Sequence, residues 1–258
     1  MNAAPCGGMP SFAFFDLDHT LLPFDTQTLF ANFVLRRERW RTGLLAGIAP
    51  VAVMRAVGLA KTVTTKRAFM SLYAGMKRET LFAYAKEFAE TEVRRWVYPE
   101  LMEIMAEHRR AGRMLILNTA SPDYYAPMIG EVLGFDYSIA TKVIIPEKVN
   151  VMPEVVGLNN KREAKLVHMK QAVPEVAAAT KEELEDSWSY SDSSADLPLL
   201  KFAGNAMLIH PSPALEAIGK EHRWQVLRPA RPYSSRWGNW GSSLRQAMGI
   251  YPSTAVQT

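Results

Sequence analysis

Short apolar segments alternate with helical patterns along most of this chain, and this alternation is the strongest constraint on its fold. Strands are predicted at 12–16, 113–118, 137–141, 188–192, 206–210 and 224–227. Helices are predicted among them at 99–111, 122–133, 160–171 and 213–220, and the segment 142–157 is predicted to form a hairpin. Parallel strands need crossover connections, which helices usually supply on both faces of the sheet. We therefore expect an α/β core built on a mostly parallel sheet.

The interval from about residue 26 to residue 95 departs from this alternation, because it contains helical periodicity and no convincing strand. Helices are predicted there at 26–41, 43–60, 64–75 and 79–93. We interpret 25–95 as an all-helical domain inserted after the first strand, so that 11–24 and 96–228 together form the core domain. A leader, 1–10, precedes the core. An extension rich in Gly, Ser and Pro, 229–258, is expected outside the core and in part disordered.

The apolar segment 43–60, GLLAGIAPVAVMRAVGLA, has two alternative interpretations. Pro50 and Arg55 interrupt it, so it is too short and too broken for a transmembrane helix. It is either a packed helical hairpin or an element at a membrane surface. Between residues 36 and 67, eight basic residues accompany Glu38 alone, a net charge of +7 in a chain whose formal charge is +4. Such a block favours anionic partners, unless it is only a solvated helical face.

Composition indicates an ordinary globular protein in a reducing compartment. The 258 residues are 48% hydrophobic and 22% charged, which is enough for a sizeable core. The single cysteine, Cys6, cannot form an internal disulfide, and the leader has neither the basic start nor the apolar core of a signal peptide. We expect a cytoplasmic protein, with peripheral membrane contact through the inserted helices as the alternative.

Polar side chains follow three of the predicted strands, and a basic helix start adds lysines. They are Asp16 and Asp18 after the first strand, Thr119 and Ser121 (with Ala120 between them) after the second, Asp192 and Asp196 after 188–192, and Lys161 and Lys165. The carboxyl ends of parallel strands meet at one edge of a sheet, where ligands bind. Clustered carboxylates repel one another unless a cation or a proton intervenes. Oxygen ligands without a His or Cys cluster indicate Mg²⁺ rather than zinc.

Such a set supports phosphoryl transfer through a covalent carboxyl phosphate. Asp16 would attack phosphorus, and Asp18 would protonate the leaving oxygen and later take a proton from the hydrolytic water. Mg²⁺ and Lys161 would neutralise the charge on the phosphoryl oxygens, while the Thr119 hydroxyl and nearby backbone N–H groups hold them. Taken singly, each of these residues could equally be a helix cap, a turn residue or a surface lysine.

The sequence DLDHT, the hydroxyl residue after the second strand, the lysine at a helix start and YSDSSADLPLL occur in this order along the chain. In this combination the chain resembles the haloacid dehalogenase superfamily, in its phosphoserine-phosphatase-like branch (subfamily IB). The resemblance covers nearly all of 11–228. It implies a Rossmann-like three-layer core and a helical cap of the C1 type, placed at 25–95.

The resemblance also implies a role for each motif residue. Asp16 is matched to the nucleophile and Asp18 to the general acid and base. The Mg²⁺ ligands would be the Asp16 and Asp192 carboxylates and the Asp18 backbone carbonyl, with Asp196 orienting the metal's waters or the lysine. The phosphate-binding residues would be Thr119, Ala120 and Lys161, with Lys165 as the alternative lysine. Ala195 stands where the family usually has Asn. Relatives that dehalogenate lack the second acid, so Asp18 favours a phosphatase.

The substrate is less constrained than the reaction. By resemblance to phosphoserine phosphatases, Asp25 would bind a substrate amine and Arg67 a carboxylate, with Lys66 or Arg78 as alternatives to Arg67. Asp25 could equally be a helix cap. A small metabolite such as phosphoserine or histidinol phosphate is expected. The alternatives are a lipid phosphate, since the cap resembles that of bacterial phosphatidylglycerophosphatases, and an inactive protein that binds a phosphorylated ligand or a membrane surface. The arginines lack an aromatic platform for nucleic acid.

Overall fold

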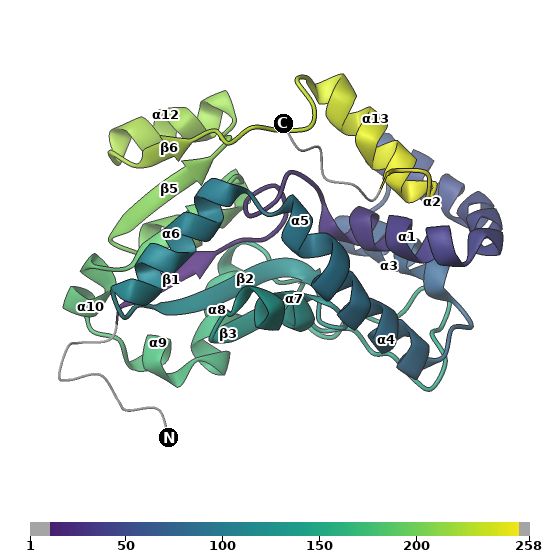
Figure 1. Ribbon diagram of the computed structural model, residues 1–258, viewed down its shortest axis with the longest axis horizontal. Helices are drawn as coiled ribbons and strands as arrows, with labels where there is room; N and C mark the ends of the chain where they lie inside the picture. The colour runs from purple at the N-terminus through teal and green to yellow at the C-terminus, as the bar shows by residue number, and fades with distance from the viewer. Residues whose placement is uncertain (1–10, 253–258) are drawn as a thin grey trace.

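The computed structural model, which describes residues 11–252, contains one sheet of six parallel strands (Figure 1). The strands are β1 (Phe12–Phe15), β2 (Met114–Pro122), β3 (Tyr137–Thr141), β4 (Trp188–Ser191), β5 (Asn205–Ile209) and β6 (Gln225–Leu227), in the spatial order β3-β2-β1-β4-β5-β6. Every neighbouring pair is parallel. The prediction of a Rossmann-like parallel sheet is therefore confirmed.

Helices cover both faces of this sheet, and the side chains of β1 alternate between them. Ala13 and Phe15 pack in the cluster that contains buried residues of α6 (Pro99–Arg110) and α7 (Ala126–Leu133). Phe12 and Phe14 pack on the other face against α8 (Glu163–Ala172), α9 (Pro174–Ala178) and α11 (Leu197–Phe202). All four residues of β1 are fully buried. Two short helices, α10 (Lys181–Glu185) and η4 (Ser194–Asp196), and α12 (Pro213–Glu221) complete the core.

Within the part of the chain that the structure describes, the elements between β1 and β2 are all helices. The last of them is α6, and the others lie within 26–96. These inserted helices are α1 (Thr26–Arg37), η1 (Arg39–Leu44), α2 (Leu45–Ala56), α3 (Thr62–Met70), η2 (Ser71–Tyr73), α4 (Arg78–Phe88), η3 (Ala89–Val93) and α5 (Arg94–Trp96). Figure 1 shows α1 to α4 on one side of the molecule, beyond the end of the sheet. The domain boundaries at 25 and 95 remain a prediction.

One connection in the core differs from the sequence-based expectation, and a second agrees with it. The helix predicted at 122–133 begins at Ala126, because β2 continues to Pro122 with a register break against β3. A residue that precedes proline disfavours the helical conformation, which fits the extended backbone at Ser121. The segment 142–157 pairs with itself through Val143 and Val155. It also bonds to the inserted helical region, where the Gly75 N–H donates to the Val149 carbonyl at 2.8 Å.

The described part of the C-terminal segment is folded onto the inserted helices, which are not part of the predicted core domain. Residues Arg236–Ala247 form α13, which packs against α1 (Figure 1). The Asn32 amide bonds to both backbone groups of Tyr251, at 3.1 and 3.0 Å. Tyr251 is buried against Phe24 and Trp96. Aromatic burial and backbone pairing thus give this Gly- and Ser-rich segment a fixed place.

Among residues 11–252, no helix combines the length and apolarity that crossing a bilayer requires. The predicted leader, with Cys6, lies outside the described residues, as do residues 253–258 at the end of the predicted extension.

Candidate active site

A cavity of about 240 Å³ lies at the carboxyl ends of the strands, between the core and the inserted helices. Its wall contains five acids, Asp16, Asp18, Asp25, Asp192 and Asp196, and three lysines, Lys66, Lys161 and Lys165. The first two acids follow β1, and Asp192 and Asp196 follow β4, so the sheet brings together groups about 175 positions apart. The strand-end argument therefore predicted the position of this cavity.

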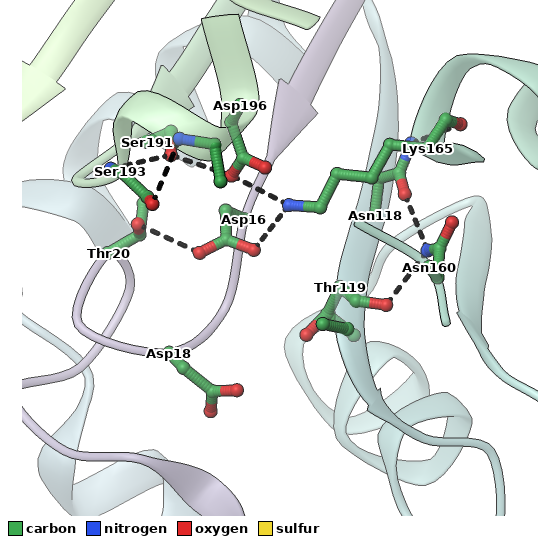
Figure 2. A network of polar contacts seen from close by, with 12 residues as sticks. Asp16, Asp18, Thr20, Asn118, Thr119, Asn160, Lys165, Ser191, Ser193 and Asp196 are labelled. Atoms are coloured by element: carbon green, nitrogen blue, oxygen red, sulfur yellow. Dashed lines mark hydrogen bonds and ion pairs between the residues drawn. The ribbon is translucent and has the colours of Figure 1, made fainter. Parts of the chain in front are cut away.

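Asp16 is the first residue after β1, and its carboxylate is held at both oxygens. The Asp16 N–H continues the sheet by donating to the Tyr190 carbonyl at 3.0 Å. Oδ1 accepts from the Lys165 ammonium at 2.6 Å, and Oδ2 accepts from the Thr20 hydroxyl at 3.2 Å (Figure 2). The residue is only 7% exposed. Asp16 is therefore a fixed carboxylate at the edge of the cavity.

Lys165, rather than Lys161, is the lysine that contacts Asp16. Its ammonium lies 2.6 Å from Asp16 and 2.7 Å from Asp196, and its side chain is buried (Figure 2). The reason is the helix register, since α8 begins at Glu163 and Lys165 lies on its buried face. Lys161 precedes the helix, is exposed and reaches the cavity wall without joining this ion pair. The two-lysine sequence KREAK left this choice open.

Asp196, which follows β4, also contacts Lys165. Its Oδ2 accepts from Lys165 and, at 2.8 Å, from the Ser191 hydroxyl. Ser191 in turn accepts from the Ser193 N–H at 3.1 Å. Ser191 was not predicted as a site residue, although it stands directly before Asp192 in the motif. Its hydroxyl contacts Asp196, the residue that follows the motif's unusual Ala195.

Asp18 points away from Asp16, toward the start of the inserted helices (Figure 2). Its Oδ1 accepts from the backbone N–H and the hydroxyl of Thr26, at 2.7 and 2.6 Å. Its Oδ2 accepts from the Ser121 hydroxyl at 2.7 Å. Thr26 is the first residue of α1, where N–H groups lack helical partners and stabilise an anion. Asp18 thus connects the core to the inserted helices.

The donor set suits Mg²⁺. The Thr20 hydroxyl lies 3.2 Å from Asp16 Oδ2 and 3.4 Å from Asp192 Oδ1, so these two carboxylates approach the same point. Within residues 11–252, no three His, Cys, Asp or Glu side chains are grouped as metal ligands. The predicted set does not need three, because Mg²⁺ usually takes one or two carboxylates and keeps several waters. The Asp16 and Asp192 carboxylates fit that pattern.

The carboxylates destabilise one another's charged forms. Burial raises the pKa of Asp16 to about 8; Lys165 opposes this, and Asp196, Asp192 and Asp18 add to it. Burial also raises the pKa of Asp192, and Asp196 contributes in the same direction. Burial disfavours the Lys165 ammonium, but Asp16 and Asp196 outweigh it and raise the pKa of this lysine. One buried ammonium does not balance these acids, so a cation would stabilise their ionised forms.

The end of β2 supplies a second wall of the cavity, formed by Ala120 and Ser121. The buried Thr119 hydroxyl instead accepts from the Ser121 N–H at 3.0 Å. Asn160 fixes this strand end, because its amide donates to Asn118 and to the Thr119 carbonyl, each at 2.8 Å (Figure 2). Asn160 is fully buried and was not predicted. An asparagine in a polar loop carries no sequence signal of such a role.

Of the two residues expected to select the substrate, Asp25 lines the cavity and Arg67 is directed elsewhere. Asp25 caps α1, with Oδ1 accepting from the Gln27 and Thr28 N–H groups at 2.8 and 3.1 Å. Arg67 donates to the carbonyls of Met152 and Pro153. Its neighbour Lys66, one helical position earlier, lines the cavity instead.

Lys66 crosses from α3 to the core. Its ammonium donates to the Ala120 carbonyl at 2.5 Å and to the Asn159 side chain at 2.7 Å. Burial lowers the pKa of Lys66 to about 8, while Asp18 and Asp25 favour its charged form. It is therefore a partly buried cation beside the loop that follows β2.

Comparisons with known proteins agree with this geometry. Residues 13–201 match the family model described as haloacid dehalogenase-like hydrolase. A histidinol-phosphatase of Neisseria meningitidis is 21% identical, over 85% of this chain and 99% of that protein. A protein of unknown function from Bordetella pertussis has a crystal structure with a TM-score of 0.72 and 27% identity, over 85% of this chain and 99% of that one. A phospho-aspartyl intermediate analogue of phosphoserine phosphatase shares the fold, with a TM-score of 0.58 and 19% identity over 87% and 95% of the chains.

Proposed function

The chain belongs to the haloacid dehalogenase-like hydrolase family, and on that premise we propose that it hydrolyses a phosphomonoester through a covalent phosphate on Asp16. The family confirms the predicted superfamily and the predicted class of hydrolase, and the phosphatases among the relatives agree with phosphomonoester hydrolysis. The observation that carries the proposal is the fixed Asp16 carboxylate at the cavity, held by Lys165 and Thr20.

In the first step, an Asp16 oxygen forms a bond to phosphorus while the bond from phosphorus to the alcohol oxygen breaks. Asp18, in its protonated form, gives its proton to the departing oxygen. In the second step, Asp18 takes a proton from water, whose oxygen attacks phosphorus and releases Asp16 and inorganic phosphate. Asp18 must turn from Thr26 and Ser121 toward the substrate to do this, and both partners are hydroxyl residues that can exchange hydrogen bonds.

Charge on the phosphoryl group is neutralised from two sides. Lys165 orients Asp16 and supplies positive charge next to it. Ala120, Ser121 and Lys161 line the cavity and would contact the phosphoryl oxygens. Mg²⁺ held by the carboxylates of Asp16 and Asp192 and the carbonyl of Asp18 would contribute electrostatic stabilisation of the transferring group.

The cavity favours a small substrate that carries an amine. Asp25 faces it with a carboxylate whose two capping bonds are both accepted by Oδ1. Lys66 also lines the cavity, and its bonds to Ala120 and Asn159 use two of its three N–H donors. Arg67 instead donates to the carbonyls of Met152 and Pro153 and does not line the cavity. Histidinol phosphate and phosphoserine both carry an amine, and only phosphoserine carries a carboxylate for Lys66. A Lys66→Ala variant should therefore lose more activity on phosphoserine than on histidinol phosphate.

The reaction is tested by Mg²⁺-dependent hydrolysis of an aryl phosphate. Asp16→Asn should abolish it, while Asp186→Asn, an exposed acid far from the cavity, should not. Activity that survives in Asp16→Asn would rule out the covalent mechanism. Complete inactivity of the unaltered protein on a screen of phosphomonoesters would instead support the alternative of an inactive ligand-binding protein.

One observation favours a second candidate substrate, a lipid phosphate. The outer face of α2 is apolar and exposed, and α2 packs against α3, whose Thr62 and Lys66 line the cavity. A screen that contains phosphoserine, histidinol phosphate, sugar phosphates and phosphatidylglycerol phosphate separates the two candidates.

A further inference from the structure

The helix α2 exposes an apolar face to solvent. Few of its side chains face the protein interior. Ile48 is buried in the hydrophobic core, and Leu45 and Val51 are partly buried against that core. All other residues of 46–59 are exposed, and Arg55 is the only charged one among them. Val53, Val57 and Leu59 are 63%, 64% and 74% exposed. A helix on the surface of a globular protein ordinarily presents polar residues on its outer side. This face is therefore built to contact something other than water.

The charged residues of the segment 39–61 are all positive. Arg39, Arg55 and Lys61 are exposed, and none of them forms an ion pair within residues 11–252. No acidic residue occurs in the sequence between Glu38 and Glu79. Two copies of this surface would oppose cation to cation, which disfavours self-association. A partner that has both an apolar region and negative charge would complement the apolar face and the positive residues beside it.

An exposed tryptophan precedes α2. Trp40 is 65% exposed, and the Arg41 guanidinium lies 4.5 Å from the centre of its ring. Tryptophan is enriched where a protein meets the boundary between lipid headgroups and acyl chains. Helices that lie in that boundary combine an apolar face with flanking basic residues. The sequence from Trp40 to Lys61 has each of these properties.

We propose that α2 and its flanking residues, 39–61, form a docking surface for the headgroup region of an anionic lipid bilayer. Val53, Met54, Val57 and Leu59 enter the apolar boundary, and Arg39, Arg55 and Lys61 contact lipid phosphates. Because α3 follows directly and lines the cavity, docking brings the cavity close to the lipid headgroups. The proposal does not depend on the substrate, since a docked enzyme can act on a soluble or a lipid phosphate.

The test is co-sedimentation of the full chain with vesicles, either of phosphatidylcholine alone or of equal parts phosphatidylcholine and phosphatidylglycerol. We expect binding to the anionic vesicles that weakens as salt is added, because screening reduces the attraction. Val53→Asp with Val57→Asp should lower the bound fraction about tenfold or more. Hydrolysis of a soluble aryl phosphate should be unchanged in this variant, because both side chains are exposed and lie outside the cavity.

A matched control is Val167→Asp with Val226→Asp, two exposed valines on α8 and β6 of the core. This pair adds the same charge and should leave vesicle binding unchanged. The proposal would be overturned if the protein bound neither kind of vesicle. It would also be overturned if both double variants lost vesicle binding to the same extent. A dimer that disappears in Val53→Asp with Val57→Asp, without vesicle binding, would identify the face as a self-association surface and would also overturn it.

Discussion

The Lys165 ammonium lies 2.6 Å from the Asp16 carboxylate and 2.7 Å from Asp196, in a buried ion triad. Removing the lysine leaves two buried carboxylates without their cation, which typically costs about 3–5 kcal/mol of the free energy of unfolding. Lys165→Met should therefore lower both thermal stability and activity, whereas Lys161→Met should affect activity alone. Thermal unfolding with and without Mg²⁺ and aryl phosphate hydrolysis measure the two effects. Equal stability loss in both variants would contradict this assignment.

Asp18 should matter most for substrates with a basic leaving oxygen, because it protonates that oxygen. Asp18→Asn is expected to slow hydrolysis of an alkyl phosphate by about 10²–10⁴-fold. The loss in the first step should be smaller for p-nitrophenyl phosphate, whose leaving group is weakly basic. Pre-steady-state release of the alcohol or phenol from both substrates measures the difference. An equal loss for the two would argue that Asp18 acts only on the hydrolytic water.

Asn160 should act as a positioning residue for the loop after β2. Its buried amide holds Asn118 and the Thr119 carbonyl, so Asn160→Ala leaves these acceptors unpaired at a cost of about 1–3 kcal/mol. We expect a lower kcat that Mg²⁺ does not rescue, together with lower stability. Asn205→Ala removes bonds to carbonyls at the far end of β4 and β5 and serves as the control. A fully active Asn160→Ala would show that the loop is fixed by other contacts.

The contact between α13 and α1 depends on Asn32. Asn32→Ala removes both bonds to the Tyr251 backbone, each worth about 0.5–1.5 kcal/mol. The C-terminal helix should then be cleaved earlier in limited proteolysis, while the core resists as before. Mass analysis of the fragments locates the cleavage. Unchanged protection of residues beyond 230 would mean that the burial of Tyr251 alone holds the segment.

His108 should make stability depend on pH. Burial lowers the pKa of this histidine from 6.5 to about 4, and Arg113 adds to the shift. Because the folded state binds the proton less tightly than the unfolded state, the protein loses stability as pH falls from 6.5 toward 4. His108→Gln should flatten this part of the curve, and His222→Gln, at an exposed position, should not. Urea unfolding midpoints across the pH range provide the measurement, and parallel curves for wild type and His108→Gln would refute the assignment.

Several features of this protein could be predicted from local pattern alone. Alternation of strands and helices specifies a parallel sheet, because each crossover helix has its own periodic signature. Asp16, Asp18 and Asp192 could be placed at one edge because strand ends are sequence-local and parallel strands share a direction. Pro50 and Arg55 likewise made 43–60 too broken for a transmembrane helix, although α2 (Leu45–Ala56) runs through both residues. Each of these conclusions uses spacing along the chain and nothing more.

Other features depend on contacts between distant segments. Lys165 replaces Lys161 against Asp16 because the first turn of α8 begins at Glu163, a boundary that the two-lysine pattern does not specify. Asp18 faces Ser121, Lys66 replaces Arg67 at the cavity by reaching Ala120, and α13 packs on α1. Each of these contacts joins segments far apart in sequence. The sequence by itself determined the sheet, the acids and the reaction class they support, because those follow from local periodicity. Only the tertiary structure decided which lysine pairs, where each carboxylate points and which helix face stays exposed, because these depend on helix register and on packing across the chain.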